Sequence, residues 1–323
     1  MLSVSMANGT VERSCDGEVA RVWDMLSDMK IRWGISCWII LLALQFATPC
    51  SAANPIYQAL VEKGLALSPQ ETVKLPPPVL TEGMTSAQQK AAIETLLAGK
   101  YEWETFARKA LVAPFLLRIN DEGREAGQVG RRVDLYFITY GSLDSMRGDD
   151  FLKGQLNFAA ADDESGDGSR VKILTADELS KRGLTADQLA GSSRWIAVES
   201  TLLNKVRLRL TTQNLKSESA DSILIASVVD PKFVNDPEYP NDWRPIAADD
   251  SGRRQIGAPQ PYAGLASYVK GAQLSDPAGA VFIEYHVAFA EPQGWFHGTN
   301  LLRSKLPLVV QNMVRKIRRS TER

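Results

Sequence analysis

Hydrophobic and polar residues alternate along residues 205–212, where Val206, Leu208 and Leu210 are separated by basic side chains. A period of two places the apolar side chains on one face of a β-strand and leaves the other face to water. The short connections that follow predict an antiparallel meander. Segments with strand-like composition lie at residues 111–119, 133–140, 195–203, 222–229, 262–274 and 280–290.

Helical patterns flank this β-rich region. Asn54-Pro55 predicts the start of a short helix, and Thr85 or Ser86 caps a second helix that ends at Gly99. Residues 300–319 form an amphipathic pattern with one apolar face. This order of elements resembles that of the helix-grip, so we expect an α+β fold in which a curved antiparallel sheet wraps around a long C-terminal helix.

Residues 230–261 separate the meander from the last two strands and are rich in proline, aspartate and aromatic residues. No regular element is predicted for them. A connection of this length is typical of a lid or a binding loop, and an insertion packed over a sheet edge is the alternative interpretation.

The N-terminus has the pattern of a secretory signal peptide. Lys30 and Arg32 precede the apolar run 33–46, and small residues follow up to Ala53. We expect translation to start at Met29, cleavage after Ala52 or Ala53, and export; an uncleaved segment would instead anchor the protein to a membrane. The expected parts are a leader and signal peptide at 1–53, an N-terminal helical segment packed on the domain at 54–110, and the sheet with its C-terminal helix at 111–323.

Charge and cysteine content exclude several function classes. Residues 1–53 hold five of the 38 acidic and four of the 37 basic residues, so residues 54–323 carry 33 of each and no net charge. Electrostatic attraction to nucleic acid is therefore not expected. Cys15, Cys37 and Cys50 are the three cysteines of the sequence, so disulfides, zinc–thiolate sites and cysteine nucleophiles are not expected in residues 54–323.

The end of the chain resembles a known family. The strand at 281–290 runs into Glu291-Pro-Gln-Gly-Trp295, and Asn300, Lys305-Leu306-Pro307 and a basic amphipathic helix follow. This succession is similar to the closing segment of START lipid-transfer domains, and the resemblance covers about residues 195–319. It implies a helix-grip fold, a tunnel between the sheet and the last helix, and a lipid ligand.

The leading interpretation is an exported, non-enzymatic protein that binds a hydrophobic or lipid-like small molecule. An envelope structural or interaction protein that has no open cavity and uses residues 230–261 is the second interpretation. The bases near the end of the last helix indicate either transient contact with an anionic membrane surface or stabilisation by the helix dipole. The sequence leaves the oligomeric state open. The ligand is expected to contact Tyr285, Val287, Leu302, Leu306, Val310 and Met313.

Few residues are candidates for catalysis or metal binding. Glu284 and His286 share one strand face, and as an acid–base pair inside a pocket they would support a third interpretation, an enzyme. Because the opposite face of this strand is the more apolar one, we expect the pair to be partly exposed on the solvated face. The acidic loop Asp162–Asp167 lacks the spacing of a calcium loop, and His297 is expected in a turn. We predict no metal and no cofactor.

Overall fold

The structure is a computed structural model that describes residues 54–67, 71–125, 128–148, 151, 170–185, 188, 193–293, 295–296 and 300–321. The predicted leader and signal peptide, the acidic loop Asp162–Asp167 and His297 lie outside these residues. Within the described ranges, no helix has both the length and the apolar character needed to cross a membrane.

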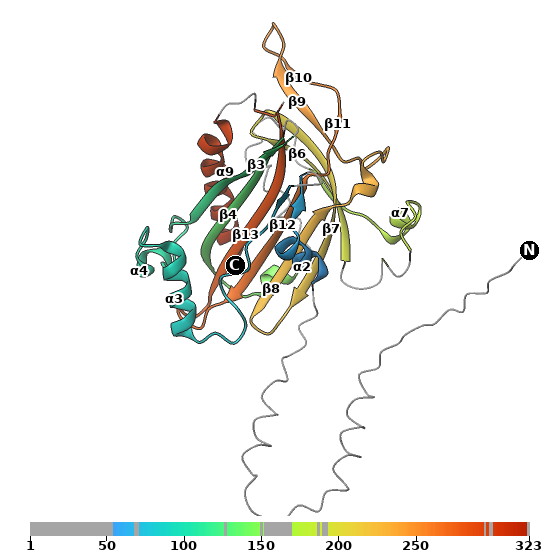
Figure 1. Cartoon of the computed structure of the whole chain (residues 1–323). Coiled ribbons are helices and arrows are strands. Elements are labelled where there is room, and N and C mark those ends of the chain that lie inside the picture. The colour runs from blue at the N-terminus through green and yellow to red at the C-terminus, as the bar shows by residue number, and fades with distance from the viewer. Residues whose placement is uncertain are drawn as a thin grey trace, which may run out of the picture. The chain divides into compact units, whose positions relative to one another are not determined.

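One large antiparallel sheet organises the described chain (Figure 1). Its strands follow the order β10-β9-β7-β8-β12-β13-β4-β3, and β6 pairs with β7 as well as with β5, while β11 pairs with β9. The strands are β3 Leu116–Glu125, β4 Gln128–Tyr140, β5 Arg170–Ile173, β6 Ser193–Leu202, β7 Val206–Glu218, β8 Ser222–Val229, β9 Asp242–Ala248, β10 Arg254–Ile256, β11 Gln260–Pro261, β12 Leu265–Gln273 and β13 Ala280–Pro292. The two-residue strands β1 Leu65–Ala66 and β2 Thr72–Val73 pair separately.

Helix ends follow the predicted capping residues. Asn54 accepts a hydrogen bond from the Tyr57 amide, and Thr85 forms a capping box with Gln88. Ala98 and Gly99 then adopt positive φ angles and end the helix. The helices are α2 Pro55–Glu62, α3 Ser86–Leu97, α4 Trp103–Phe106, α5 Asp144–Arg147, α7 Ala176–Ser180, the 3-10 turn η2 Pro231–Phe233 and α9 Leu301–Thr321.

Helix α9 packs on one face of the sheet, which we call the helix face. Alternate residues of β13, from Val281 to Phe289, share a single apolar cluster with the inner side of α9. The first and last turns of the helix both contribute to this cluster, since Leu302 and Ile317 belong to it. The predicted α+β class, with an antiparallel sheet packed against a long C-terminal helix, is confirmed.

The opposite face, which we call the N-terminal face, is covered by residues 54–107. Helix α2 packs on β8 and β12, and the rings of Tyr57 and Tyr268 meet edge to face with centroids 5.2 Å apart. Helices α3 and α4 pack on the ends of β4 and β13 through Ile93, Trp103 and Phe106. Both faces of the central strands are therefore buried, and β13 is buried from Ala280 to Glu291.

Two predictions about chain segments are wrong. Residues 230–261 form η2, β9, β10 and β11 rather than an irregular loop, because β9 finds hydrogen-bond partners on β7, which lies far from it in sequence. The strands predicted at 111–119 and 133–140 have other bounds, because β3 runs from Leu116 to Glu125 and β4 already begins at Gln128, with a bulge between Asp121 and Gly123.

Candidate functional site

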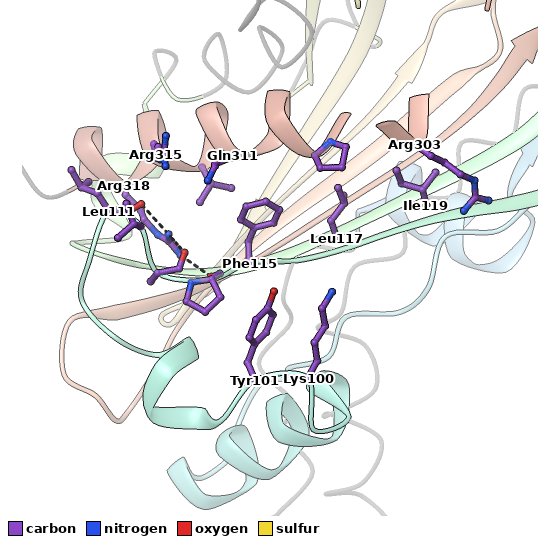
Figure 2. Close-up of a pocket in the computed structure, with 15 residues that line it drawn as sticks. Lys100, Tyr101, Leu111, Phe115, Leu117, Ile119, Arg303, Gln311, Arg315 and Arg318 are labelled. Carbon is purple, nitrogen blue, oxygen red and sulfur yellow. Dashed lines mark hydrogen bonds between the residues drawn. The ribbon is translucent and has the colours of Figure 1, made fainter. Parts of the chain in front are cut away.

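A groove runs between α9 and the edge strand β3 (Figure 2). Its volume is about 440 Å³, which lies within the range of about 300–1,000 Å³ found for ligand sites. The loop at residues 111–115 closes one end, and the segment after α3 forms its lower wall. The groove therefore combines residues from two distant parts of the chain, 100–119 and 303–318.

The walls of the groove are largely apolar. Phe115, just before β3, alternates with Leu117 and Ile119 of the strand, so all three side chains face α9, and each remains half-buried. Figure 2 shows Phe115 and Leu117 pointing from the strand toward the helix. Pro307 contributes apolar surface from α9, where it is exposed. These side chains leave hydrocarbon surface that the protein itself does not cover.

Cationic side chains also line the groove, beside these apolar residues. Lys100, Arg303, Arg315 and Arg318 are among the fifteen lining residues, and none of the fifteen is acidic. Figure 2 shows Lys100 and Tyr101 reaching from the segment after α3 toward the groove. The Lys100 ammonium lies 5.6 Å from the centroid of the Tyr101 ring. The groove thus has an amphipathic character with a positive charge.

Arg318 fixes the shape of the closed end. Its side chain is buried, and its guanidinium donates hydrogen bonds to the carbonyls of Ile138, Leu111, Ala113 and Pro114, at 2.9, 3.3, 2.6 and 3.1 Å. These bonds join α9 to β4 and to the loop before β3. We conclude that Arg318 is a structural cation, since its donors are used by backbone groups.

The six residues predicted to contact a ligand lie together but outside this groove. All six are buried in the cluster between α9 and the helix face: Tyr285, Val287, Leu302, Leu306, Val310 and Met313. Val314 belongs to that cluster and also lines the groove, so the packed cluster and the groove adjoin each other. Contact of the six residues with a ligand stays a prediction.

A short polar strip interrupts the apolar helix face. Ser227 lies beside Ser267 on the neighbouring strand and donates to the Asn214 side chain at 2.5 Å. Burial raises the pKa of the Tyr285 hydroxyl to about 12, and a hydrogen bond with Ser267 opposes this rise. These buried groups are hydrogen-bonded to one another, which removes the cost of placing them in an apolar core.

Trp295, which follows the last strand, lies in the apolar cluster between α9 and the helix face. It is 2% exposed, and its ring contacts the rings of Trp243, Tyr262, Phe289 and Phe296, with centroids 5.2–6.2 Å apart. Within the described chain its indole N–H has no hydrogen-bond partner. The residue therefore contributes mainly apolar contact area at the start of α9.

The expectation for Glu284 and His286 is wrong. Both side chains are fully buried, because residues 76–80 cross the N-terminal face above them. The Glu284 carboxylate accepts hydrogen bonds from the amides of Val79 and Leu80, at 2.8 and 3.5 Å. Lys270, the cross-strand neighbour of Glu284, donates to the Leu80 carbonyl at 2.6 Å. The pair lies on the face opposite α9, so it does not point into the groove.

His286 forms a second buried pair on this face. Its Nδ1 lies 2.8 Å from a carboxylate oxygen of Asp134, and its Nε2 lies 3.8 Å from Glu284. Burial lowers the pKa of His286, but the hydrogen bond with Asp134 and the charge of Glu284 outweigh it, so the net shift is upward. The pKa of Asp134 is lowered, since His286 and Arg132 together overcome the effect of burial.

These buried charges hold the N-terminal segment in place. Tyr268 supports the same contact, because its hydroxyl donates to the Pro76 carbonyl at 2.7 Å. Burial lowers the pKa of Lys270, and the nearby Glu284 opposes that effect. Glu284 and Lys270 therefore anchor the backbone at Val79 and Leu80 to the sheet.

In the part of the chain that the structure describes, no group of three or more His, Cys, Asp or Glu side chains is placed to hold a metal ion.

Sequence reasoning missed the groove because its residues are separated by up to about 200 positions. The one local signal was the alternation of Phe115, Leu117 and Ile119, which a strand prediction assigns to a core face.

No protein-family model matches the chain, and no curated protein matches it. Solved structures do match, and one of them is the crystal structure of human STARD10. The two share 10% sequence identity with a TM-score of 0.30, over 73% of this chain and 82% of that chain. The helix-grip arrangement of this chain follows from its own strand order and from the position of α9 on the sheet.

Proposed function

We propose that this protein binds a hydrophobic or lipid-like small molecule in the groove between α9 and β3 and releases it chemically unchanged. The observation that supports this proposal best is the groove itself. It has a volume of about 440 Å³, and Phe115, Leu117 and Ile119 remain half-buried along it. Apolar side chains that the fold leaves accessible inside a concave site are typical of ligand-binding surfaces.

The deeper part of the proposed site is the cluster under α9. Val314 links the groove to that cluster, so a ligand longer than the groove would approach Val310 and Met313. The proposal that the ligand is not transformed is supported by the position of Glu284 and His286, which are buried on the opposite face of the sheet.

We further propose that the protein acts outside the cytoplasm. This part is supported by the basic, apolar and small-residue order of residues 30–53. The N-terminal sequence of the protein isolated from its native source tests it directly. A chain that begins near residue 54 supports export with cleavage, whereas a chain that retains residues 29–50 overturns cleavage.

Ligand binding is tested with N-phenyl-1-naphthylamine, a neutral dye that fluoresces in apolar surroundings. We expect the purified protein to enhance its fluorescence. The substitution Gln311→Trp fills the groove from α9 and should reduce this enhancement several-fold. Leu308→Trp is the matched control, because Leu308 lies on the same helix, is 55% exposed and does not line the groove. Equal enhancement by the wild type and both variants would contradict the proposed site.

One observation favours an interaction role as a second candidate. The hairpin of β9 and β10 extends beyond the rest of the sheet in Figure 1, and all three residues of β10 are exposed. Ile256 in β10 is one of the few large exposed apolar residues in the described chain. If this hairpin binds a protein partner, Ile256→Asp should abolish that association and leave binding of the dye unchanged.

A further inference from the structure

The positive charge of the groove is a local feature. Residues 54–323 carry equal numbers of acidic and basic residues, yet the groove is lined by four cations and by no carboxylate. A low-dielectric concave wall strengthens the field of such charges at the site. The groove therefore differs in charge from the molecule as a whole.

The four cations differ in how they are paired. Arg318 uses its donors on backbone carbonyls, and Arg303 lies 2.9 Å from Asp121. Asp121 is also paired with Arg131. Among the described residues, Lys100 and Arg315 have no acidic partner within 4 Å, and the Lys100 ammonium lies over the face of the Tyr101 ring.

We infer that the ligand of this groove is a single-chain amphiphile with an anionic head group, either a carboxylate or a phosphate. Lys100 and Arg315 lie on opposite walls of the groove, and their combined positive potential attracts the head group, while the hydrocarbon chain lies along Phe115, Leu117 and Ile119. This inference rests on the proposed function, because it specifies the chemical class of the ligand at the same site.

Both charge and an apolar chain are needed to explain the lining. A purely apolar ligand would make no use of the positive charges of Lys100 and Arg315. An inorganic anion would leave the apolar side chains of Phe115, Leu117 and Ile119 uncovered. A fatty acid and a lysophospholipid share the required chemistry. They differ in the head group, so a carboxylate probe and a phosphate probe distinguish these two sources.

The test compares four probes that share one alkyl chain: dodecanoate, dodecyl phosphate, 1-dodecanol and dodecyltrimethylammonium. Each is titrated below its critical micelle concentration against the protein saturated with N-phenyl-1-naphthylamine. At low ionic strength we expect at least one anionic probe to displace the dye about five-fold more effectively than 1-dodecanol, and the cationic probe to be weakest. The difference should shrink at 0.5 M salt, because the head group is partly exposed.

The variants Lys100→Gln and Arg315→Gln should each weaken the anionic probe about three- to five-fold and leave 1-dodecanol unchanged. Lys316→Gln is the matched control, because Lys316 is an exposed base next to Arg315 that does not line the groove. Equal displacement by anionic and neutral probes, or equal effects of all three variants, would overturn the inference and leave the proposed function intact. Failure of the wild type to bind the dye or any probe would overturn both.

Discussion

Replacing Glu284 with glutamine should loosen the N-terminal segment from the sheet. Glu284 is fully buried, accepts the amides of Val79 and Leu80, and lies opposite Lys270 on the adjacent strand. Glutamine keeps one acceptor oxygen but removes the negative charge. The ammonium of Lys270 then remains buried without its counter-charge, and such a loss costs about 3 kcal/mol of unfolding free energy.

The charge interaction itself can be estimated from the register. Directly paired residues on adjacent antiparallel strands place their Cβ atoms about 5 Å apart, so the two charges lie roughly 6 Å apart. With an effective dielectric constant of about 20, two unit charges at that separation interact by about 2–3 kcal/mol. A double-mutant cycle with Lys270→Met should therefore give a coupling energy of about 2 kcal/mol, because the double variant no longer buries an unpaired charge.

Urea unfolding of the four proteins supplies the free energies, provided that the m-value stays constant across the set. Hydrogen exchange of the Val79 and Leu80 amides gives the local readout, and both should exchange faster in Glu284→Gln. A coupling energy below about 0.5 kcal/mol would refute the charge argument. Unchanged exchange at both amides would refute the anchoring role of the carboxylate.

Three further predictions concern other contacts. Asp134→Asn should lower the pKa of His286, because it removes the negative charge beside the ring. In the wild type that pKa is raised on folding, so protonated His286 stabilises the fold below pH 6.5, and this stabilisation is lost as the pH rises through the folded pKa. The urea midpoint of the wild type should therefore fall above pH 6.5, and this fall should be smaller in the variant. Arg318→Met leaves four backbone carbonyls without their donor and should lower the unfolding free energy by about 3 kcal/mol, with faster proteolysis at residues 111–114. Thr85→Ala removes the capping box of α3 and should cost about 1 kcal/mol by the same urea assay.

The local elements of this fold were predictable because their signals are local. Asn54 and Thr85 are N-caps, and the alternation from Val206 to Leu210 marks a strand with one apolar face. The sequence separated the two faces of β13 correctly, since Val281 to Phe289 meet α9 in alternation. These patterns depend only on the period of the side chains along the backbone.

Predictions failed where a distant segment decides the environment. Glu284 and His286 look like residues of a solvated face, yet residues 76–80 cover that face and supply amide donors to Glu284. In the same way, β9 forms because β7 offers a free edge, which no local pattern in 230–261 reveals. Burial by a segment about 200 residues away cannot be read from a window of a few residues.

The anchors of α9 explain why the groove can keep a fixed charge pattern. Arg318 binds carbonyls of β4 and of the loop before β3, and the Thr321 hydroxyl lies 2.5 Å from that of Thr139. Both anchors lie in the last turn of the helix, close to Arg315, so the backbone that carries Arg315 is held to the sheet. At the other end, Pro307 removes one helix hydrogen bond and Arg303 is held only by an exposed ion pair. Arg315, one of the two cations proposed to attract the head group, thus lies on the firmly attached half of the helix, so ligand binding requires little further ordering of the backbone that carries it.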